Sequence, residues 1–366
     1  MSTVRSNTYQ DASGGSNAVF SGVASPPNSM GFRNRLLNSD MRIDQRNAGA
    51  SVTPADGAYT LDRWRAGASA ASKFSVQQSS VAPAGFNFSM LCTSLSAYSV
   101  GTNDNFEMFQ YIEGFNTADL AWGTASAQAV TLSFWVRSSL TGTFGGAINN
   151  SAFNRSYPFS YTISAANTWE QKSITIAGDT SGTWLTNNGT GLIFCICIGA
   201  GATRSGTAGS WSGTWFASAT GATSVVGTNG ATFYITGVQL EAGTVASPFE
   251  RRDYGRELIM CQRYCFKMAP TSNYGPYGMG HGVNTTDFRV FIKTAQTMRA
   301  QPTLSFTAAS GFLWSFGNAL SAISAAEYGV DGFSVSCTTT GVAANGGYLL
   351  TSNNNTTSSI TASAEL

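Results

Sequence analysis

The feature of this sequence that most constrains its fold is a series of short segments in which apolar and polar residues alternate. The clearest is VTLSFWVR at 130–137, where every second residue is apolar. A period of two places alternate side chains on opposite faces of a β-strand, so that one face packs and the other meets solvent. Similar runs occur at 86–92, 173–176, 288–292 and 333–337. Turn clusters separate these runs, which is typical of a β-sandwich or jelly roll.

One further run, LIFCICIG at 192–199, is apolar at nearly every position and predicts a central strand buried on both faces. It places Cys195 and Cys197 on the same side of that strand. The chain has six cysteines, and His281 is its single histidine, so a metal site at the CxC pair lacks further ligands. The pattern therefore favours buried free thiols, and we expect neither a bound metal nor a cofactor.

The stretch 232–265 links a strand, a turn and a helix without a break. Its first part alternates, and the phase shift at Gly237 indicates a β-bulge. Its second part carries apolar residues at spacings of four, three and four, which predicts one buried helical face. The members of that stripe are Tyr254, Leu258, Cys261 and Cys265. We interpret the stretch as the closing strand of a sandwich, followed by a charged helical joint.

Length and composition bound the organisation of the chain. A length of 366 residues favours two or three domains. The predicted parts are an N-terminal arm at 1–30, a jelly-roll module at 31–250, a helical joint at 251–265 and a C-terminal β head at 266–366. The fold class is therefore all-β, a jelly-roll β-sandwich joined by a short helix to a smaller sandwich-like head.

Charge and hydropathy exclude several kinds of partner. Charged residues are 11% of the chain and the net charge is +1, so no broad electrostatic field attracts nucleic acid or an anionic membrane. The first ten residues lack the apolar core of a secretory signal, and no run of about 18 apolar residues occurs. We expect a protein made in soluble form, without a membrane span.

The residues 1–30 are polar and rich in Gly and Ser, so they cannot build a core of their own. Two interpretations remain open for them. One is a disordered leader. The other is an ordered attachment arm, in which Val19, Phe20 and Val23 are buried against a partner.

Two groups of motifs carry a resemblance to a known family. They are NRLLNSDMRIDQRNAG with YTLDRW near the front, and GVQLEAG with SPFERRDYGRELIMCQRY further on. The chain resembles bacteriophage tail-fibre and virion structural proteins that contain a jelly-roll carbohydrate-binding-like module. The resemblance implies a homotrimer that docks on phage tail or baseplate proteins through its N-terminal arm. It also implies a place in the virion tail, after assembly in the reducing host cytoplasm.

Catalysis finds little support among the residues. Nucleophilic catalysis needs a histidine base, and His281 lies alone in a glycine-rich loop. A glycosidase needs two carboxylates across a sugar, but no spacing singles out a pair. The acids of the sandwich region are Glu107, Glu113, Asp119, Glu170 and Asp179. We expect no enzyme.

A structural calcium ion would use Asp40, Asp44, Asp56 or Asp62, whose spacing matches no defined loop.

Sugar binding has better support. Carbohydrate sites stack pyranose rings on exposed aromatic rings and surround them with hydrogen-bonding side chains. Trp135 and Arg137 share the outward phase of their strand, which places a stacking ring beside a donor fork. The loop candidates for glycan binding are Trp122, Trp211 and Trp215. The alternative for each tryptophan is packing against a neighbouring subunit or the other sheet.

We therefore predict a trimeric tail-fibre subunit that binds host cell-surface glycans without catalysis. The first alternative is a capsid decoration protein or other architectural protein of the virion, and a glycan-degrading tailspike comes last. The basic residues between 251 and 267 are balanced by Glu250, Asp253 and Glu257, which favours ion pairs at a domain or subunit seam over nucleic-acid binding.

Overall fold

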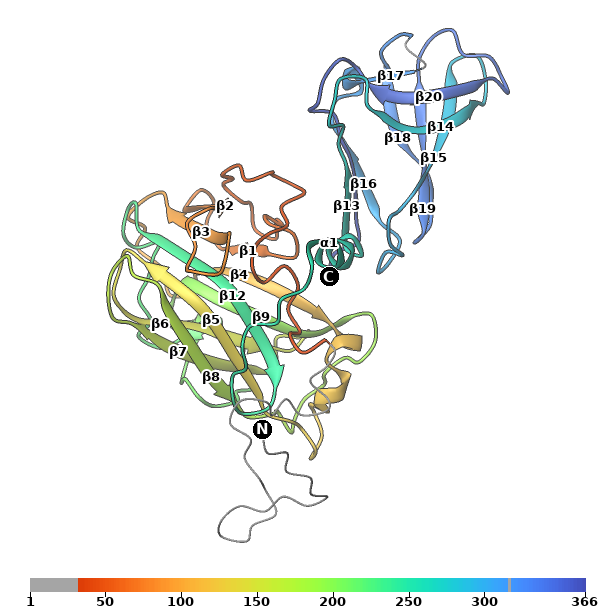
Figure 1. The fold of residues 1–366 in the computed structure, drawn as a ribbon. Helices are drawn as coiled ribbons and strands as arrows, with labels where there is room; N and C mark the ends of the chain where they lie inside the picture. Colours follow the sequence, from red (N-terminus) through yellow and green to blue (C-terminus); the bar gives the residue numbers. More distant parts are fainter. Residues whose placement is uncertain (1–31, 315–316) are drawn as a thin grey trace, which may run out of the picture.

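The computed structural model describes residues 32–314 and 317–366, which form two lobes joined by a single α-helix (Figure 1). Nearly all regular structure in these residues is β-strand, which confirms the predicted all-β class. The predicted arm residues Val19, Phe20 and Val23 lie outside the described residues. No described helix is long and apolar enough to cross a membrane.

The larger lobe is a sandwich of two five-stranded antiparallel sheets, here called sheet A and sheet B. Sheet A contains, in spatial order, β2 (Phe74–Ser79), β3 (Ser89–Ser94), β12 (Thr232–Ala242), β5 (Val130–Ser138) and β8 (Glu170–Ile176). Sheet B contains β1 (Arg65–Ala68), β4 (Asn105–Glu113), β9 (Thr190–Ala200), β6 (Gly142–Asn149) and β7 (Ser156–Ile163). Strands distant in sequence are neighbours in both sheets, as in a jelly roll.

Short elements complete this lobe. A two-stranded parallel ribbon and three 3₁₀ turns lie in its connections. They are β10 (Ser205–Gly206), β11 (Ser218–Ala219), η2 (Gly114–Asn116), η3 (Ala118–Leu120) and η4 (Ala202–Arg204).

The core of the sandwich comes from the alternation of its strands. Val130, Leu132, Phe134 and Val136 are fully buried on the inner face of β5, as the sequence pattern predicts. The apolar run of β9 occupies the centre of sheet B, and its residues are buried on both faces. The prediction of a central strand there is confirmed.

The bulge predicted at Gly237 is also confirmed. The pairing of β12 with β5 shifts register between Thr236 and Gln239. Gly237 has a φ of +60°, which a residue with a Cβ adopts only at a cost. A Cβ at this position would also collide with the ring of Phe86. The bulge shifts the alternation of inward and outward residues along β12 by one position, and Val238 is therefore buried in the core.

The helix α1 (Tyr254–Gln262) differs from the predicted stripe. Its N-cap is Asp253, whose carboxylate accepts from the backbone N–H of Arg256 at 2.9 Å. Cys261 is buried as predicted, but Tyr254 is 56% exposed, and Cys265 lies beyond the helix in a strand. The prediction is wrong for these two residues.

The physical reason for the shorter helix is strand pairing across the chain. Residues 265–268 pair with residues 360–363, close to the C-terminus, and these hydrogen bonds replace further helical ones. A pattern confined to 254–265 contains no information on that partner.

The smaller lobe contains two antiparallel sheets around a second core. The three-stranded sheet has the order β13 (Cys265–Met268), β21 (Ile360–Ser363) and β16 (Thr303–Phe306). The six-stranded sheet has the order β17 (Phe312–Trp314), β20 (Gly347–Ser352), β14 (Pro276–Gly282), β15 (Asp287–Lys293), β19 (Gly332–Thr338) and β18 (Ala322–Tyr328). One 3₁₀ turn, η5 (Ala309–Gly311), precedes β17. The buried residues of this lobe form a core separate from that of the sandwich.

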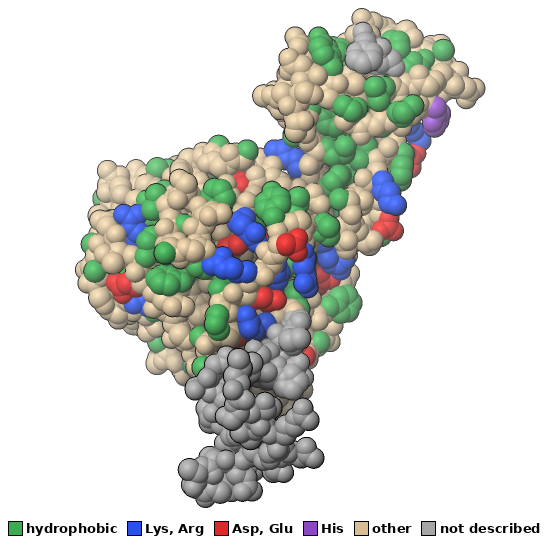
Figure 2. Space-filling model, in the orientation of Figure 1, with side chains coloured by type: hydrophobic (Ala, Val, Ile, Leu, Met, Phe, Trp, Pro, Cys, Tyr) green, Lys and Arg blue, Asp and Glu red, His purple; other side chains and the backbone are tan. Residues whose placement is uncertain are grey.

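Ion pairs hold the junction between the lobes. Arg263 donates to the two carboxylate oxygens of Glu113 at 2.9 and 2.6 Å, and the Tyr264 hydroxyl donates to Glu113 at 2.6 Å. Arg252 pairs with Glu257 at 3.3 Å. Figure 2 shows charged side chains gathered where the large lobe approaches the small one. The prediction of ion pairs at a seam is confirmed for Arg252, which pairs with nearby acids, whereas Arg263 pairs with the distant Glu113 of the sandwich.

The C-terminal residues are part of the same junction. Glu365 forms ion pairs with Arg46 and Arg63, and the Tyr59 hydroxyl donates to the carbonyl of Leu366 at 2.7 Å. The Leu366 side chain packs against a cluster on sheet B that includes Phe109. The end of the chain therefore ties the small lobe to the sandwich.

The six cysteines are all buried and unpaired. The prediction of buried free thiols is confirmed. Burial raises the pKa of the thiols at Cys92 and Cys197 to about 12, so neither is a reactive thiolate at neutral pH.

Candidate functional site

The outer face of sheet A carries the residue pair that the sequence singled out. On β5 the inner residues Phe134 and Val136 are fully buried, whereas Trp135 and Arg137 are partly exposed on the opposite face. Trp135 lies opposite Thr236 of β12, and Arg137 lies opposite Tyr234. The structure therefore brings Trp135 and Arg137 onto one accessible surface.

Two more aromatic rings lie beside this pair, and sequence analysis missed both. Tyr234 is on the outer face of β12, and Trp169 immediately precedes β8. Their ring centroids are 6.1 Å apart in an edge-to-face arrangement, and both side chains are partly exposed. Tyr234 is a diagonal neighbour of Trp135 across the two strands, a position about 7 to 8 Å away. The outward phase of Tyr234, between buried Phe233 and Ile235, was the signal that could have found it.

Arg137 is held in place within this group. Its guanidinium carbon lies 5.0 Å from the Tyr234 ring centroid, and its Nε donates to the Asn167 carbonyl at 2.8 Å. A cation over a tyrosine face gains roughly 0.5–1 kcal/mol at an exposed site. We call Trp135, Arg137, Trp169 and Tyr234 the aromatic platform.

Beyond the bulge, the loops that carry Phe86 and Phe249 cover the part of sheet A next to the platform. Phe86 and Phe249 meet edge to face at 5.2 Å, and the Arg251 guanidinium lies 4.7 Å from the Phe86 centroid. A Cβ on Gly237 would touch both Phe86 and Trp135, so the bulge lets these rings approach the sheet closely. The loops that carry Phe86 and Phe249 thus form one wall of the platform.

The loop candidates Trp122 and Trp211 belong to a different place. With Trp184 they form a cluster of three rings, each edge to face with the other two, at centroid distances of 4.8 to 5.5 Å. Each indole N–H donates to a backbone carbonyl, those of Gln128, Ser181 and Ala177. This cluster closes one edge of the sandwich core.

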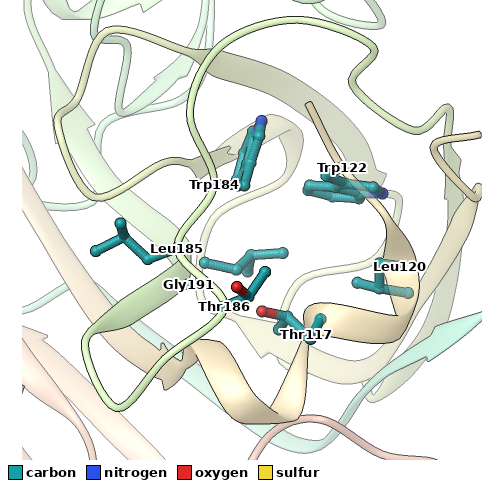
Figure 3. Close-up of a pocket in the computed structure, with 9 residues that line it drawn as sticks. Thr117, Leu120, Trp122, Trp184, Leu185, Thr186 and Gly191 are labelled. Atoms are coloured by element: carbon teal, nitrogen blue, oxygen red, sulfur yellow. The ribbon is translucent and has the colours of Figure 1, made fainter. Parts of the chain in front are cut away.

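The space beside this cluster is small. Figure 3 shows Trp122 and Trp184 facing a cavity with Thr117, Leu120 and Gly191 on its other sides. The cavity volume is about 10 Å³, room for about one water molecule and none for a sugar ring. Trp122 is only 7% exposed. The geometry at Trp122 is that of packing.

An ion pair lies beside Trp211, the third ring of the cluster. Arg155 donates from Nε and Nη2 to the two oxygens of Asp179, each at 2.7 Å. The same guanidinium lies 5.9 Å from the Trp211 centroid, and Tyr157 meets Trp211 edge to face at 5.2 Å. Trp211 is partly exposed, so it is a weaker candidate for sugar contact than Trp135.

The remaining candidate, Trp215, contacts Phe153, which packs against the apolar cluster on the outer face of sheet B. Its ring lies 4.0 Å from the Arg204 guanidinium and 5.1 Å from the Phe153 ring. Its indole nitrogen is buried and has no hydrogen-bond partner among the described residues. Both ring neighbours therefore compete with any ligand for the same surface.

The acids considered for catalysis have structural partners. Four of them pair with basic residues: Glu113 with Arg263, Asp119 with Arg35, Glu170 with Lys172 and Asp179 with Arg155. The fifth, Glu107, is fully buried, and burial raises its pKa to about 8. None of the five is an exposed, unpaired carboxylate.

The aspartates considered for calcium also have protein partners. Asp40 pairs with Arg42, Asp44 accepts from two backbone N–H groups, Asp56 accepts from Ala68 and Asp62 accepts from Gln45. Within the described residues no group of three His, Cys, Asp or Glu side chains is arranged to hold a metal ion.

A hollow of about 440 Å³ lies at the junction of the lobes. Apolar side chains line much of it, including Phe115, which is 63% exposed. Of its polar residues, Glu113, Arg263 and Tyr264 bond to one another, which leaves Asn116 and Gln296 as its uncharged polar lining. The hollow is part of the seam between the lobes. The aromatic platform is the candidate site, because the terminal Nη groups of Arg137 have no hydrogen-bond partner among the residues that the structure describes.

No protein-family model and no curated protein matches the chain. Similar solved structures include the enzymatically active domain of bacteriophage CBA120 tailspike protein 4, at 11% identity and a TM-score of 0.30 over 50% of this chain and 19% of that one. TmCBM61 in complex with β-1,4-galactotriose is similar at 12% identity and a TM-score of 0.30, over 58% of this chain and 99% of that one.

A third similar structure is a family 11 carbohydrate-binding module from Clostridium thermocellum in complex with a β-1,3-1,4-mixed-linked tetrasaccharide. It has 13% identity and a TM-score of 0.28, over 54% of this chain and 98% of that one. The chain spans 19% of the length of the tailspike domain that it matches. At TM-scores this low, the similarities assign neither a family nor a function.

Proposed function

We propose that this chain is a non-catalytic, glycan-binding subunit of a phage tail fibre. The observation that carries the proposal is the aromatic platform on the outer face of sheet A. Trp135, Trp169 and Tyr234 offer partly exposed ring surface, and Arg137 offers donors beside them. Aromatic faces with a few convergent polar groups suit the apolar face and the hydroxyl rim of a pyranose.

The platform is formed by strands rather than by loops alone, and this supports a binding role. Trp135, Arg137 and Tyr234 lie on adjacent strands whose inner faces are locked in the core. Little side-chain order must then be gained when a ligand binds, so less of the contact energy is lost. Reversible binding without turnover also fits the pairing of the nearby acid Glu170 with Lys172.

The first test of this function is the substitution Trp135→Ala. We expect the affinity for host surface glycan to fall about tenfold or more, because a central aromatic contact is lost. Adsorption of purified protein to host cells and glycan titration measure the effect. The matched control is Phe115→Ala, which removes another exposed ring, one that lines the hollow at the junction of the lobes and not the platform.

The fold must be intact in both variants, as checked by their thermal unfolding temperatures. Equal binding by the wild-type protein and a folded Trp135→Ala variant would contradict the proposed site.

The tail-fibre assembly is proposed as a homotrimer, following the family resemblance of the sequence motifs. An exposed apolar pair on the small lobe supports self-association. Met279 is 74% exposed and Phe291 is 61% exposed. The pairing of Gly280 with Val290 places these two side chains opposite each other on β14 and β15. Exposed apolar groups on neighbouring strands are typical of interaction surfaces.

Native mass spectrometry across a wide concentration range tests the trimer, and a monomer throughout would contradict it. The exposed pair Met279 and Phe291 would equally serve a capsid decoration protein, which is the second candidate function. Immunogold labelling of intact particles separates the two, because tail tips and capsid shell are distinct locations.

A further inference from the structure

Arg137 has binding capacity that the protein does not use. Its Nε donates to the Asn167 carbonyl, and its guanidinium lies over Tyr234. Among the described residues, no hydrogen bond or ion pair engages its terminal Nη groups, which thus remain available as donors. An arginine in this position presents N–H donors in a fixed planar arrangement to a ligand bound on the aromatic platform.

The rest of the outer face of sheet A is almost uncharged. The side chains that point outward from its strands are mainly Ser, Thr and Gln, and Arg137 is accompanied by one acid, Glu241. Glu241 is 3% exposed and accepts from the Ser247 backbone at 2.9 Å and from its hydroxyl at 2.5 Å. Its charge is further offset by Arg33 at 3.7 Å.

The acid nearest to the platform in sequence is also engaged. Glu170, next to Trp169, accepts from the backbone N–H groups of Ser164 and Ala165 and pairs with Lys172 at 2.6 Å. It therefore contributes no free negative charge. The guanidinium of Arg137 is left as the uncompensated charge on this surface.

A second arginine lies at the wall of the platform. Arg251 is exposed and rests on Phe86 and Phe249, and among the described residues it forms no ion pair. Asp40, whose carboxylate is close enough to Arg251 for an electrostatic interaction, forms its ion pair with Arg42, at 2.5 Å. Both ends of the aromatic strip therefore carry a guanidinium, and neither is neutralised by an acid of its own.

We propose that the platform selects an anionic glycan, with Arg137 as the residue that contacts the negative group. This inference rests on the proposed glycan-binding function and specifies its ligand class. The carboxylate of a uronic or sialic acid and the phosphate of a phosphorylated glycan share the required chemistry. Two parallel N–H donors of a guanidinium match two oxygens of either group, and such charge-assisted hydrogen bonds are about twice as strong as neutral ones.

The aromatic rings and the arginine divide the recognition between them. The rings of Trp135, Trp169 and Tyr234 hold the sugar by stacking, which tolerates neutral and anionic residues alike. Arg137 adds affinity only when a negative group is present. Because the pair is at the protein surface, the added affinity decreases as ionic strength rises.

The test begins with an array of neutral, carboxylated and phosphorylated bacterial polysaccharides, probed with the wild-type protein. The tightest ligand is then compared with its own derivative in which the carboxyl groups are reduced to alcohols or the phosphates are removed. We expect the wild-type protein to bind the uncharged derivative about tenfold more weakly. The derivative that shows the loss identifies which anionic group is recognised.

The substitution Arg137→Gln should lower affinity for the anionic glycan about tenfold and leave affinity for its uncharged derivative nearly unchanged. The matched control is Arg256→Gln, which removes one exposed positive charge from α1 and should change neither affinity.

The outcomes separate this inference from the function on which it rests. Equal binding of anionic and uncharged glycans, with both dependent on Trp135, would overturn the anionic preference and leave the platform as a glycan site. Failure to bind any polysaccharide on the array would overturn both.

Discussion

Glu107 gives the sharpest prediction because a carboxyl group is enclosed inside the protein. It lies on β4 and is fully buried. Its Oε1 accepts from Asn105 Nδ2 at 2.6 Å, and its Oε2 has no partner among the described residues. Burial is the main cause that raises the pKa of this carboxyl from 4.5 to about 8, and Asp56 adds to it, while Arg204 opposes it.

The sign of the effect on stability follows from the two pKa values. Unfolding releases Glu107 into water, where it loses its proton above pH 4.5, whereas the folded protein keeps the proton up to about pH 8. Rising pH therefore favours the unfolded state throughout this window. One pKa unit corresponds to about 1.4 kcal/mol, so the free energy of unfolding falls by about 5 kcal/mol between pH 4.5 and pH 8, and the loss is complete above pH 8.

The substitution Glu107→Gln removes the titrating group and keeps its shape. We expect the variant to match the wild-type protein within about 1 kcal/mol at pH 5, where the buried carboxyl is protonated. At pH 8.5 it should be more stable than the wild-type protein by up to about 5 kcal/mol. Denaturant unfolding followed by the fluorescence of the eight tryptophans measures both values across the pH range.

The matched control is Glu170→Gln. Pairing with Lys172 lowers the pKa of the Glu170 carboxyl, so its titration lies below pH 4.5 and adds no slope between pH 5 and pH 9. The reasoning would be refuted if wild-type protein and Glu107→Gln had the same dependence of unfolding free energy on pH between 5 and 8.

Two further predictions concern the backbone and the junction. Gly237→Ala should lower the free energy of unfolding, measured with denaturant, by about 2 kcal/mol, because of the positive φ and the collision with Phe86. The control Gly213→Ala, whose Cβ meets no neighbour, should leave this free energy nearly unchanged. Equal losses in the two variants would contradict this account. Glu365→Ala should lower the free energy of unfolding by about 3 kcal/mol, because it leaves Arg63 buried without its acidic partner. In limited proteolysis, the variant should be cut near the junction of the lobes sooner than the wild-type protein. Unchanged stability and cleavage would contradict a role for this ion pair.

Local alternation was enough to predict which way side chains point along a strand. Trp135 and Arg137 were placed outward from sequence because Phe134 and Val136 must face the core, and the structure agrees. Gly237 was recognised as a bulge for a similar reason, since the apolar phase changes there. These features depend on residues within a few positions of each other, so the sequence contains the signal.

Features that depend on distant segments could not be predicted in this way. Cys265 fits the helical spacing, yet it joins a strand that pairs with Ser363. Trp122, Trp184 and Trp211 meet in one cluster although they come from three separate connections. Loop tryptophans look alike in sequence whether they pack on each other or face solvent, because only the folded chain decides what covers them.

The two outer faces of the sandwich show what that covering does. The outer face of sheet B is apolar, with Ile193 and Cys195 fully buried, and it is covered by the segment that carries Ala217 and by the side chain of Leu366. Part of the surface of sheet B is therefore used to attach the small lobe, since Glu365 and Leu366 anchor there. Within residues 32–314 and 317–366, no comparable segment covers the outer face of sheet A around Arg137, and its rings are partly exposed. The small lobe thus docks away from the face of sheet A on which glycan binding is proposed. Shortening the C-terminus should therefore expose the apolar face of sheet B and leave the proposed glycan affinity at sheet A unchanged.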